Sequence, residues 1–372
     1  MRFVTVFPQA ENVHLRKGVG KIPFLFHQLF GYESVLLTVS NAIPEENVVN
    51  DTPGLIIDTI NNKNQTFQVL KYIFFRAAKI DILNLYSLSK STFFQGLLYK
   101  ILNPNGILYL KMDMNYEYLD WLTKSGVSKF HILLWSWFFN KKCTLISYEA
   151  KSVGRLLQIF YSIKENRMHY MPIGIDLTAI RNLPFSKKEF NQKENIILSV
   201  GRIGIFDKNN EMLLDASLKL ELKGWRIVFA GPVHPDFKTI TEKYFIQNPE
   251  MKGKVVFTGN IDNFEGISLW YNRSKVFCLT SRQESGPTAL TEAMYWGNYV
   301  VSTRLRSVEE MLNGGKLGSV IDNETQLVNT LQHCFDNAGT LEEQTKFASQ
   351  KIEQEFSWQV LVQNLKNRLD SI

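Results

Sequence analysis

The sequence has little of what several classes of protein require. Its 372 residues contain only three cysteines, Cys143, Cys278 and Cys334, an odd number without metal-binding spacing. This excludes a disulfide-rich scaffold and a cysteine-based zinc site, and it is typical of a reducing compartment. Low-complexity tracts and internal repeats are also missing from the chain.

Long apolar runs are missing as well. The longest, residues 131–139, is far shorter than the about 20 residues that a transmembrane helix needs. Residues 1–7 lead directly into a predicted strand and lack a cleavage site, so we expect no signal peptide. We therefore expect a cytoplasmic location, with a peripheral place at the inner face of the cell membrane left open.

The excess of positive over negative charge lies entirely in the first half of the chain. Residues 1–185 carry 20 Lys and Arg against 13 Asp and Glu, a net of +7, and the remaining 22 and 23 give −1. A basic half attracts a nucleic acid, an anionic bilayer or a phosphorylated substrate. Solvated lysines that keep the protein soluble are the alternative.

Length and periodicity predict the fold class. A chain of 372 residues favours two domains, and 45% hydrophobic residues suffice for a core in each. Short apolar strands alternate with helical segments along the whole chain, which predicts α/β domains with mostly parallel sheets.

One stretch combines a predicted buried strand, a polar loop and a helix. Ligands of parallel sheets bind beyond the carboxyl ends of the strands, and this loop follows the strand 276–279. Glu284 and Glu292 lie in the loop and the helix, and the helix opens at Gly286, Pro287 and Thr288, where free N–H groups favour phosphate. We interpret this as a site for a phosphorylated ligand with hydroxyl groups. On spacing alone, a capped helix with two solvated acids is equally acceptable.

A second cluster of polar residues follows the predicted strand 196–200. Arg202 and Lys208 lie between this strand and a helix that starts near Asn210. An Arg fork and a Lys point charge can together hold a diphosphate. Salt bridges to acids such as Asp207 are the alternative.

Both segments resemble the signature motifs of glycosyltransferase family 4. The first matches the family's two glutamates with seven residues between them, and the second matches its Gly-Arg, five residues, Lys motif. The resemblance implies the GT-B fold, two Rossmann-like domains facing across a cleft, and a retaining, metal-independent reaction with a nucleotide-diphosphate sugar. It implies that Glu284 contacts the donor sugar, that Glu292 holds the ribose, and that Arg202 and Lys208 bind the diphosphate.

In the first half, the same resemblance points to three further residues. Gly18 and Gly20 belong to a predicted loop, residues 8–21, that faces the donor diphosphate in the family. Asp113 stands at the end of the predicted strand 107–111, where many family members place a His. A helix N-cap is the alternative role for Asp113. A metal-binding acid pair would need a second acid, which is missing, so we expect no metal and no other cofactor.

Residues 130–139 are aromatic and flanked by lysines. Aromatic residues with flanking lysines are typical of an interfacial membrane helix. A buried core helix of a Rossmann-like domain is the alternative, and it is the interpretation that we favour.

These observations predict a hexosyltransferase-type enzyme with four segments. They are an acceptor-side domain (1–176), a linker (177–194), a nucleotide-sugar domain (195–355) and a closing helix (356–372) that crosses back to the first domain. The resemblance favours a UDP-sugar over a GDP-sugar as the donor. We expect the acceptor to be a glycan or lipid-linked precursor of a cell-surface polysaccharide, and we expect no nucleic-acid partner. A sugar-nucleotide epimerase and a non-catalytic partner subunit are the alternatives. A nicotinamide-dependent oxidoreductase is disfavoured because the third glycine of its fingerprint is missing.

Overall fold

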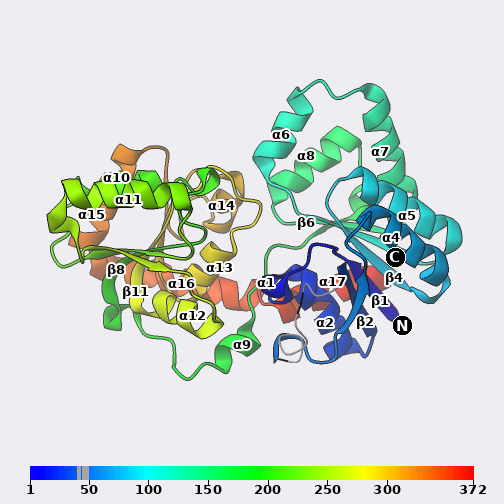
Figure 1. The fold of residues 1–372 in the computed structure, drawn as a ribbon, viewed down its shortest axis with the longest axis horizontal. Coiled ribbons are helices and arrows are strands. Elements are labelled where there is room, and N and C mark those ends of the chain that lie inside the picture. Colours follow the sequence, from blue (N-terminus) through cyan, green and yellow to red (C-terminus); the bar gives the residue numbers. More distant parts are fainter. Residues whose placement is uncertain (40–42, 44–49) are drawn as a thin grey trace. The chain divides into compact units, whose positions relative to one another are not determined.

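The computed structural model describes residues 1–39, 43 and 50–372, and the chain divides into two compact units (Figure 1). The first unit comprises Met1–Gly174 together with Ser357–Ile372, and the second comprises Ile175–Phe356. Each unit contains one parallel sheet with helices on both faces, which confirms the predicted class of two Rossmann-like α/β domains.

The first unit is built on a seven-stranded sheet of order β3-β2-β1-β4-β5-β6-β7, with all strands parallel. The strands are β1 (Arg2–Val6), β2 (Glu33–Val39), β3 (Ile56–Ile60), β4 (Ile82–Tyr86), β5 (Ile107–Met112), β6 (Leu145–Tyr148) and β7 (Met168–Tyr170). Nearly continuous apolar sequences form the central strands, because helices cover both faces of a parallel sheet. All five residues of β4 are buried.

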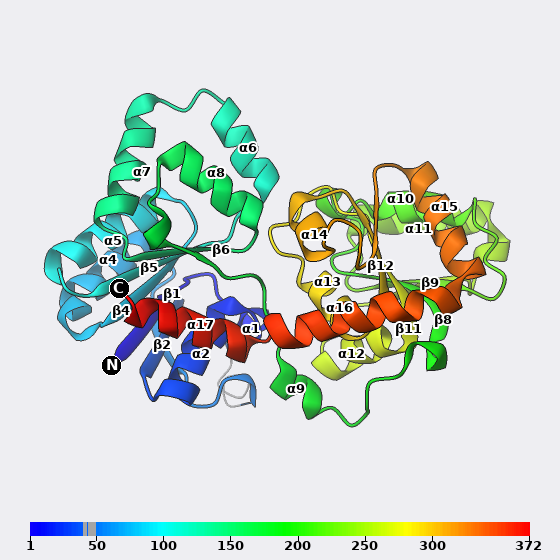
Figure 2. The ribbon, with the colours of Figure 1, turned by 180° about the vertical axis from the view of Figure 1, so that it is seen from behind.

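Helices cover the two faces of this sheet in separate apolar clusters. One cluster packs α4 (Gln65–Arg76), α5 (Lys90–Leu102), α6 (Tyr116–Lys124), α7 (Lys129–Lys141) and α8 (Lys151–Tyr161) on the sheet. The other packs α2 (Gly18–Phe30) and the last helix, α17 (Trp358–Asp370), on the opposite face. Figure 2 shows α17 beside α2, so the carboxyl end of the chain completes the core of the first unit.

The second unit repeats this plan with six parallel strands in the order β10-β9-β8-β11-β12-β13. The strands are β8 (Glu194–Val200), β9 (Arg226–Ala230), β10 (Val255–Gly259), β11 (Ser274–Leu279), β12 (Tyr299–Thr303) and β13 (Ser319–Ile321). One face packs α10 (Asn210–Ser217), α11 (Pro235–Gln247) and α15 (Glu324–Asp336). The other packs α12 (Phe264–Arg273), α13 (Thr288–Tyr295), α14 (Arg306–Met311) and α16 (Glu342–Glu355).

Two predicted segments differ from the structure. The predicted loop 8–21 is interrupted by α1 (Asn12–Leu15), and α2 starts at Gly18, so the loop is shorter than predicted. The segment 177–194, predicted as a linker, lies in the second unit and contains α9 (Leu177–Arg181) and a 3-10 turn, Phe190–Gln192. The apolar side chains of Leu177 and Phe190 are buried, which explains why this polar-looking stretch is ordered.

Each sheet has one point at which the strand order reverses. In the first unit it lies between β1 and β4, and in the second between β8 and β11. The chain leaves the two strands at such a point in opposite directions, so a crevice opens at their carboxyl ends. Ligands of open α/β sheets bind in this crevice, and candidate sites are therefore sought at both places.

Candidate active site

In the second unit, the segment after β8 presents two cations. Beyond Val200 the chain passes through Gly201, whose φ of 145° favours glycine, and through the 3-10 turn Phe206–Lys208 before α10 begins. Lys208 therefore lies at the carboxyl edge of the sheet. Arg202 is exposed, and within the described residues it has no ion-pair partner. Arg202 is therefore open to a ligand, whereas Lys208 forms an ion pair.

The loop after β11 supplies the partner of Lys208. Glu284 forms an ion pair with the Lys208 ammonium and accepts a hydrogen bond of 2.7 Å from Ser281 Oγ. The Lys208 and Glu284 side chains are 23% and 11% exposed, so the pair is accessible from solvent although mostly buried. The salt bridge predicted as the alternative role of Lys208 does form, but its acid is Glu284 and not Asp207. A cation and a carboxylate lie side by side where the strand order reverses.

Backbone and side-chain contacts join the two loops. Thr280 donates a hydrogen bond of 3.1 Å to the carbonyl of Lys208, and the N–H of Arg282 donates one of 2.7 Å to the carbonyl of Asp207. The Arg282 guanidinium also lies 4.4 Å from the centre of the Phe206 ring. The loops therefore hold the Lys208–Glu284 pair in place before any ligand arrives.

The helix after Glu284 brings a second carboxylate. Pro287 occupies the N-cap of α13 and supplies no side-chain cap, which leaves the first N–H groups of the helix available to an anion. Glu292 lies one turn further, close to the hydroxyl of Tyr271. Burial, and secondarily the Glu292 carboxylate, raise the pKa of that phenol well above its usual value.

Glycines bring the neighbouring strand ends together. A side chain at Gly231 would place its Cβ 1.9 Å from the carbonyl oxygen of Gly201, and the φ of Gly231 is 140°. The Gly231 N–H also donates a hydrogen bond of 3.1 Å to the carbonyl of Gly259. The ends of β8, β9 and β10 thus form one closely packed edge beside Lys208.

In the first unit, the predicted glycines lie in a helix rather than in a loop. Gly20 packs on the backbone of Leu15, where a Cβ would come within 2.5 Å. A Cβ on Gly18 would meet Lys111 and Trp358 at 3.2 Å. Both glycines therefore permit close packing at the start of α2, and their part in binding the donor stays a prediction.

Asp113 follows β5 and is exposed. Its alternative role as an N-cap is wrong, because Asn115 caps α6 by accepting a hydrogen bond from the N–H of Tyr118 at 2.6 Å. Asp113 instead lies near a buried ion pair between Lys111 and Glu149, which are 2.5 Å apart and have side chains 2% and 3% exposed. Asp113 thus stays a predicted site residue, without a role assigned by its contacts.

The environment of Glu149 disfavours its charge. Burial raises the pKa of this carboxyl to about 7, Lys111 opposes the rise, and the charge of Asp113 adds to it. One oxygen of Glu149, Oε2, is buried and has no hydrogen-bond partner among the described residues.

Sequence reasoning missed both the Lys111–Glu149 pair and the contact of Ser281 with Glu284. A lysine inside the otherwise apolar strand 107–112 was the available signal for the buried pair. No sequence pattern predicted the hydrogen bond from Ser281 to Glu284, because this contact depends on the path of the loop.

No helix in the described part of the chain is long and apolar enough to span a bilayer. Among the same residues, no three His, Cys, Asp or Glu side chains are grouped as a metal site. The three cysteines are free and buried.

Comparison with known proteins identifies the class to which this fold belongs. Both units together resemble solved GT-B glycosyltransferases. The Anabaena protein HepE in complex with UDP superposes with a TM-score of 0.78 over 100% of both chains at 12% identity. A glycosyltransferase from Rickettsia africae gives 0.76 at 16% identity, over 99% of this chain and 98% of that one. The predicted GT-B fold is confirmed.

Residues 181–353, which lie within the second unit, match the family described as glycosyl transferases group 1. The predicted resemblance to glycosyltransferase family 4 is thereby confirmed. A relative from Campylobacter jejuni is 25% identical over 188 residues, which are 47% of this chain and 50% of that protein. Its name is GalNAc-α-(1→4)-GalNAc-α-(1→3)-diNAcBac-PP-undecaprenol α-1,4-N-acetyl-D-galactosaminyltransferase. The match thus spans about half the length of either protein.

Proposed function

We propose that the protein is a glycosyltransferase that moves a sugar from a nucleotide-diphosphate sugar to a glycan or lipid-linked acceptor. The observation that carries the proposal is the Lys208–Glu284 pair, supported by Ser281, at the carboxyl edge of the second sheet. A diphosphate needs a cation, and a sugar hydroxyl needs a hydrogen-bond acceptor such as a carboxylate. A nucleotide sugar carries both groups next to each other.

The chemistry of transfer assigns a task to each group. Breaking the anomeric C–O bond leaves negative charge on the departing diphosphate. Arg202, Lys208 and the uncapped N–H groups at the start of α13 stabilise that charge. Glu284 orients the sugar and Glu292 fixes the ribose, and positioning of this kind contributes several kcal/mol.

Retention follows in this proposal from attack of the acceptor on the face that the diphosphate leaves. The leaving phosphate takes the proton of the acceptor hydroxyl, so the reaction requires no nucleophilic carboxylate of the kind that retaining hydrolases use. The proposal also includes independence of a metal ion, because two protein cations neutralise the diphosphate. Activity that survives EDTA would support this part.

Two relatives support the choice of substrates. The HepE structure contains UDP, and the name of the Campylobacter enzyme describes an acceptor linked to PP-undecaprenol. We therefore favour UDP over GDP as the donor nucleotide. We also favour a lipid-linked precursor of a cell-surface polysaccharide as the acceptor.

A panel of UDP- and GDP-linked sugars tests the proposal. Thermal unfolding and slow hydrolysis are followed for wild type, Glu284→Ala and Lys208→Ala, with the exposed Lys238→Ala as the matched control. A donor at a hundred times its dissociation constant stabilises the folded state by about 2.7 kcal/mol. We expect one donor to stabilise wild type and Lys238→Ala only.

The other outcomes separate the alternatives. Conversion of the nucleotide sugar into its epimer without any acceptor would identify an epimerase. Donor binding without hydrolysis or transfer would identify a non-catalytic partner subunit. A lack of response to every nucleotide sugar would contradict the proposal itself.

The location at the inner face of the membrane is a further part of the proposal, and α7 supports it. This helix divides its aromatic residues between two faces: Trp135, Phe138 and Phe139 are buried, as expected for a core helix. Phe130 and Leu133 are 75% and 68% exposed. The buried face of α7 therefore fits the role of a core helix, and its exposed face fits the role of an interfacial helix.

Cations and further aromatic residues surround the exposed face of α7. Trp121 of the neighbouring α6 is 60% exposed, and Lys142 lies 5.4 Å from the ring of Trp137. Figure 1 shows α6 and α7 together on one side of the first unit. Exposed rings with nearby lysines can insert at the headgroup level of an anionic bilayer.

Partition into vesicles tests this surface. A lysine near an anionic membrane contributes about 1 kcal/mol, so replacing Lys129, Lys141 and Lys142 by Gln should weaken binding to phosphatidylserine vesicles by roughly 100-fold. A matched triple variant in the second unit, at Lys238, Lys243 and Lys252, should bind as wild type does. Equal binding of both triple variants would contradict the location.

A further inference from the structure

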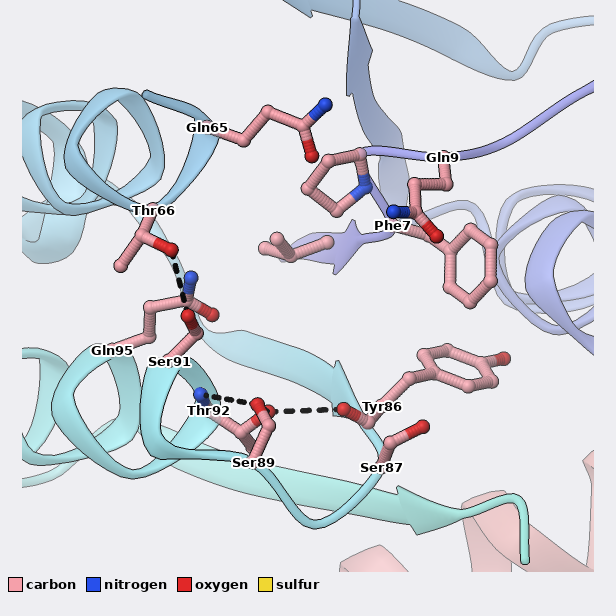
Figure 3. A pocket seen from close by; sticks show the side chains of 12 residues that line it. Phe7, Gln9, Gln65, Thr66, Tyr86, Ser87, Ser89, Ser91, Thr92 and Gln95 are labelled. Atoms are coloured by element: carbon pink, nitrogen blue, oxygen red, sulfur yellow. Dashed lines mark hydrogen bonds between the residues drawn. The ribbon is translucent and has the colours of Figure 1, made fainter. Parts of the chain in front are cut away.

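The first unit has a cavity of about 200 Å³ at the carboxyl ends of β1 and β4 (Figure 3). The first turns of α4 and α5 complete its walls. This is the point at which the strand order of the first sheet reverses, the counterpart of the position that Lys208 and Glu284 occupy in the second. The place is therefore suited to a ligand, and the motifs discussed above assign none to it.

Among the residues that the structure describes, no charged side chain lines this cavity. Its polar groups are amides and hydroxyls, among them Gln9, Gln65, Ser87, Ser91 and Gln95, and its apolar wall includes the rings of Phe7 and Tyr86. The surrounding unit carries 21 basic against 13 acidic residues, so a neutral lining is not what its overall composition would produce.

Several of these polar groups are available to form hydrogen bonds with a ligand. Within the described part of the chain, the side chains of Gln9, Ser87 and Gln95 have no hydrogen-bond partner. Gln95 is the most significant of them, because it is only 6% exposed and a buried amide without a partner is unfavourable. Such an amide is expected to bind water or a ligand in the cavity.

Other groups of the lining are fixed in place. Thr66 Oγ1 and Ser91 Oγ are 2.7 Å apart and join α4 to α5, and Ser89 Oγ accepts a hydrogen bond of 3.1 Å from the N–H of Thr92 (Figure 3). Ser87 has a φ of 65°, which is uncommon for a residue other than glycine. The walls are therefore preorganised, while the three open groups remain available.

The chemistry of the lining selects the ligand. A phosphate or carboxylate would lose its hydration without gaining a counter-charge, and an apolar ligand would leave the amides unsatisfied. A sugar ring both donates and accepts hydrogen bonds through its hydroxyls, and it presents C–H groups to aromatic rings. The volume equals that of roughly seven water molecules, at about 30 Å³ each, which accommodates a single ring.

We propose that this cavity binds one uncharged sugar ring of the acceptor. The inference rests on the proposed function and adds to it: the acceptor is recognised through a neutral glycan unit, at a site separate from the cations that hold the donor. Gln95 and Gln9 are the residues that determine this recognition.

Saturation-transfer NMR with small probes tests the site. The neutral probes are methyl glycosides of galactose, glucose and N-acetylglucosamine, and the anionic probes are glucuronate and glucose 6-phosphate. Gln95→Leu keeps the size of the side chain and removes its polar group, and the exposed Gln9→Leu serves as a second variant that is safe for folding. The exposed Gln247→Leu, in the second unit, is the matched control.

We expect at least one neutral glycoside to bind wild type and Gln247→Leu equally, and to bind each cavity variant roughly tenfold more weakly. Undiminished binding to both cavity variants, a preference for the anionic probes, or no glycoside binding by wild type would overturn the inference.

The donor response of the same samples separates this inference from the proposed function. Lys208→Ala should lose the nucleotide sugar and keep the glycoside. A nucleotide-sugar response without glycoside binding would refute the cavity assignment alone. Glycoside binding without any nucleotide-sugar response would refute the transferase and leave a sugar-binding protein.

Discussion

The two units share a fold and differ in the chemistry at the same position. Both sheets reverse their strand order once, between β1 and β4 in the first unit and between β8 and β11 in the second. The crevice of the second unit presents Lys208 and Glu284, whereas the described residues that line the cavity of the first present amides, hydroxyls and apolar groups. The net charge of the whole units does not follow this difference: it is +8 for the first unit, whose cavity is neutral, and −2 for the second. Local geometry, and not overall charge, decides what each crevice can bind.

Each unit also contains one Lys–Glu pair near the carboxyl edge of its sheet, and the exposure of the two pairs differs. Lys111 and Glu149 are 2% and 3% exposed, against 23% and 11% for Lys208 and Glu284. A buried pair cannot exchange its partner for a ligand without unfavourable desolvation, whereas an accessible pair can. We therefore assign a structural role to the first pair and a binding role to the second.

Removing one member of the buried pair should have the largest effect. Lys111→Met leaves Glu149 buried without its partner and should lower the free energy of unfolding by about 3–5 kcal/mol at pH 8. Urea denaturation measures this loss. The double variant Lys111→Met/Glu149→Leu should recover most of it, and Lys124→Met, at an exposed pair, should be indistinguishable from wild type. A small effect of Lys111→Met would remove the distinction between the two pairs.

Removing the cation of the accessible pair should affect catalysis instead. Lys208→Ala takes one stabilising charge from the leaving diphosphate and should lower kcat/KM for transfer roughly 100- to 1,000-fold. Steady-state kinetics measures it, with Lys238→Ala as the control. If Lys208→Ala transferred sugar at the wild-type rate and Lys111→Met did not, the binding role would belong to the Lys111–Glu149 pair and not to the Lys208–Glu284 pair.

The dependence of stability on pH gives a further test within the first unit. Burial raises the pKa of Glu149 to about 7, so its contribution to stability is full below the unfolded pKa and falls as pH rises toward 7. Burial lowers the pKa of His169, in β7, to about 4, so its contribution is full above the unfolded pKa and falls as pH drops toward 4.

Between about pH 4.5 and 6.5 the two slopes therefore oppose each other, each by about 1.4 kcal/mol per pH unit. Glu149→Gln should make stability rise more steeply with pH, and His169→Gln should make it fall. Unfolding free energies at several pH values check this, and parallel curves for wild type and Glu149→Gln would contradict the buried position of Glu149.

The smallest expected effect concerns Ser281, which donates a hydrogen bond to Glu284 of the accessible Lys208–Glu284 pair. Ser281→Ala removes the hydrogen bond of 2.7 Å to Glu284 and should weaken donor binding by about 1 kcal/mol, roughly fivefold. Calorimetric titration with the donor measures it. Ser274→Ala is not a suitable control because Ser274 is buried, so the exposed Ser371→Ala serves instead.

The sequence predicts the fold, and it points to candidate site residues more clearly in the second unit than in the first. Strand and helix alternation predicted both sheets, and two local motifs predicted Arg202, Lys208, Glu284 and Glu292 because each motif joins a strand end to the next helix. The pairing of Lys208 with Glu284 was not predictable, since 76 residues separate them and only the order of β8 and β11 brings them together.

The cavity of the first unit left no signal in the sequence. Gln9 and Gln95 lie on segments far apart in the chain, and glutamines and serines are ordinary on any surface. The start of α2 was also misplaced. Gly18 and Gly20 suggested a loop, whereas the structure uses both for close packing, Gly20 against Leu15. Spacing along the chain does not distinguish these two uses of glycine.

Hydrogen exchange with and without ligands tests most directly whether the two crevices divide the substrates between them. A bound ligand slows exchange of the amides that it orders. We expect UDP to protect residues 201–210 and 281–290, and a neutral methyl glycoside to protect residues 86–95. Protection of residues 86–95 by UDP, with no change at Lys208 and Glu284, would contradict the assignment of the donor to the second unit.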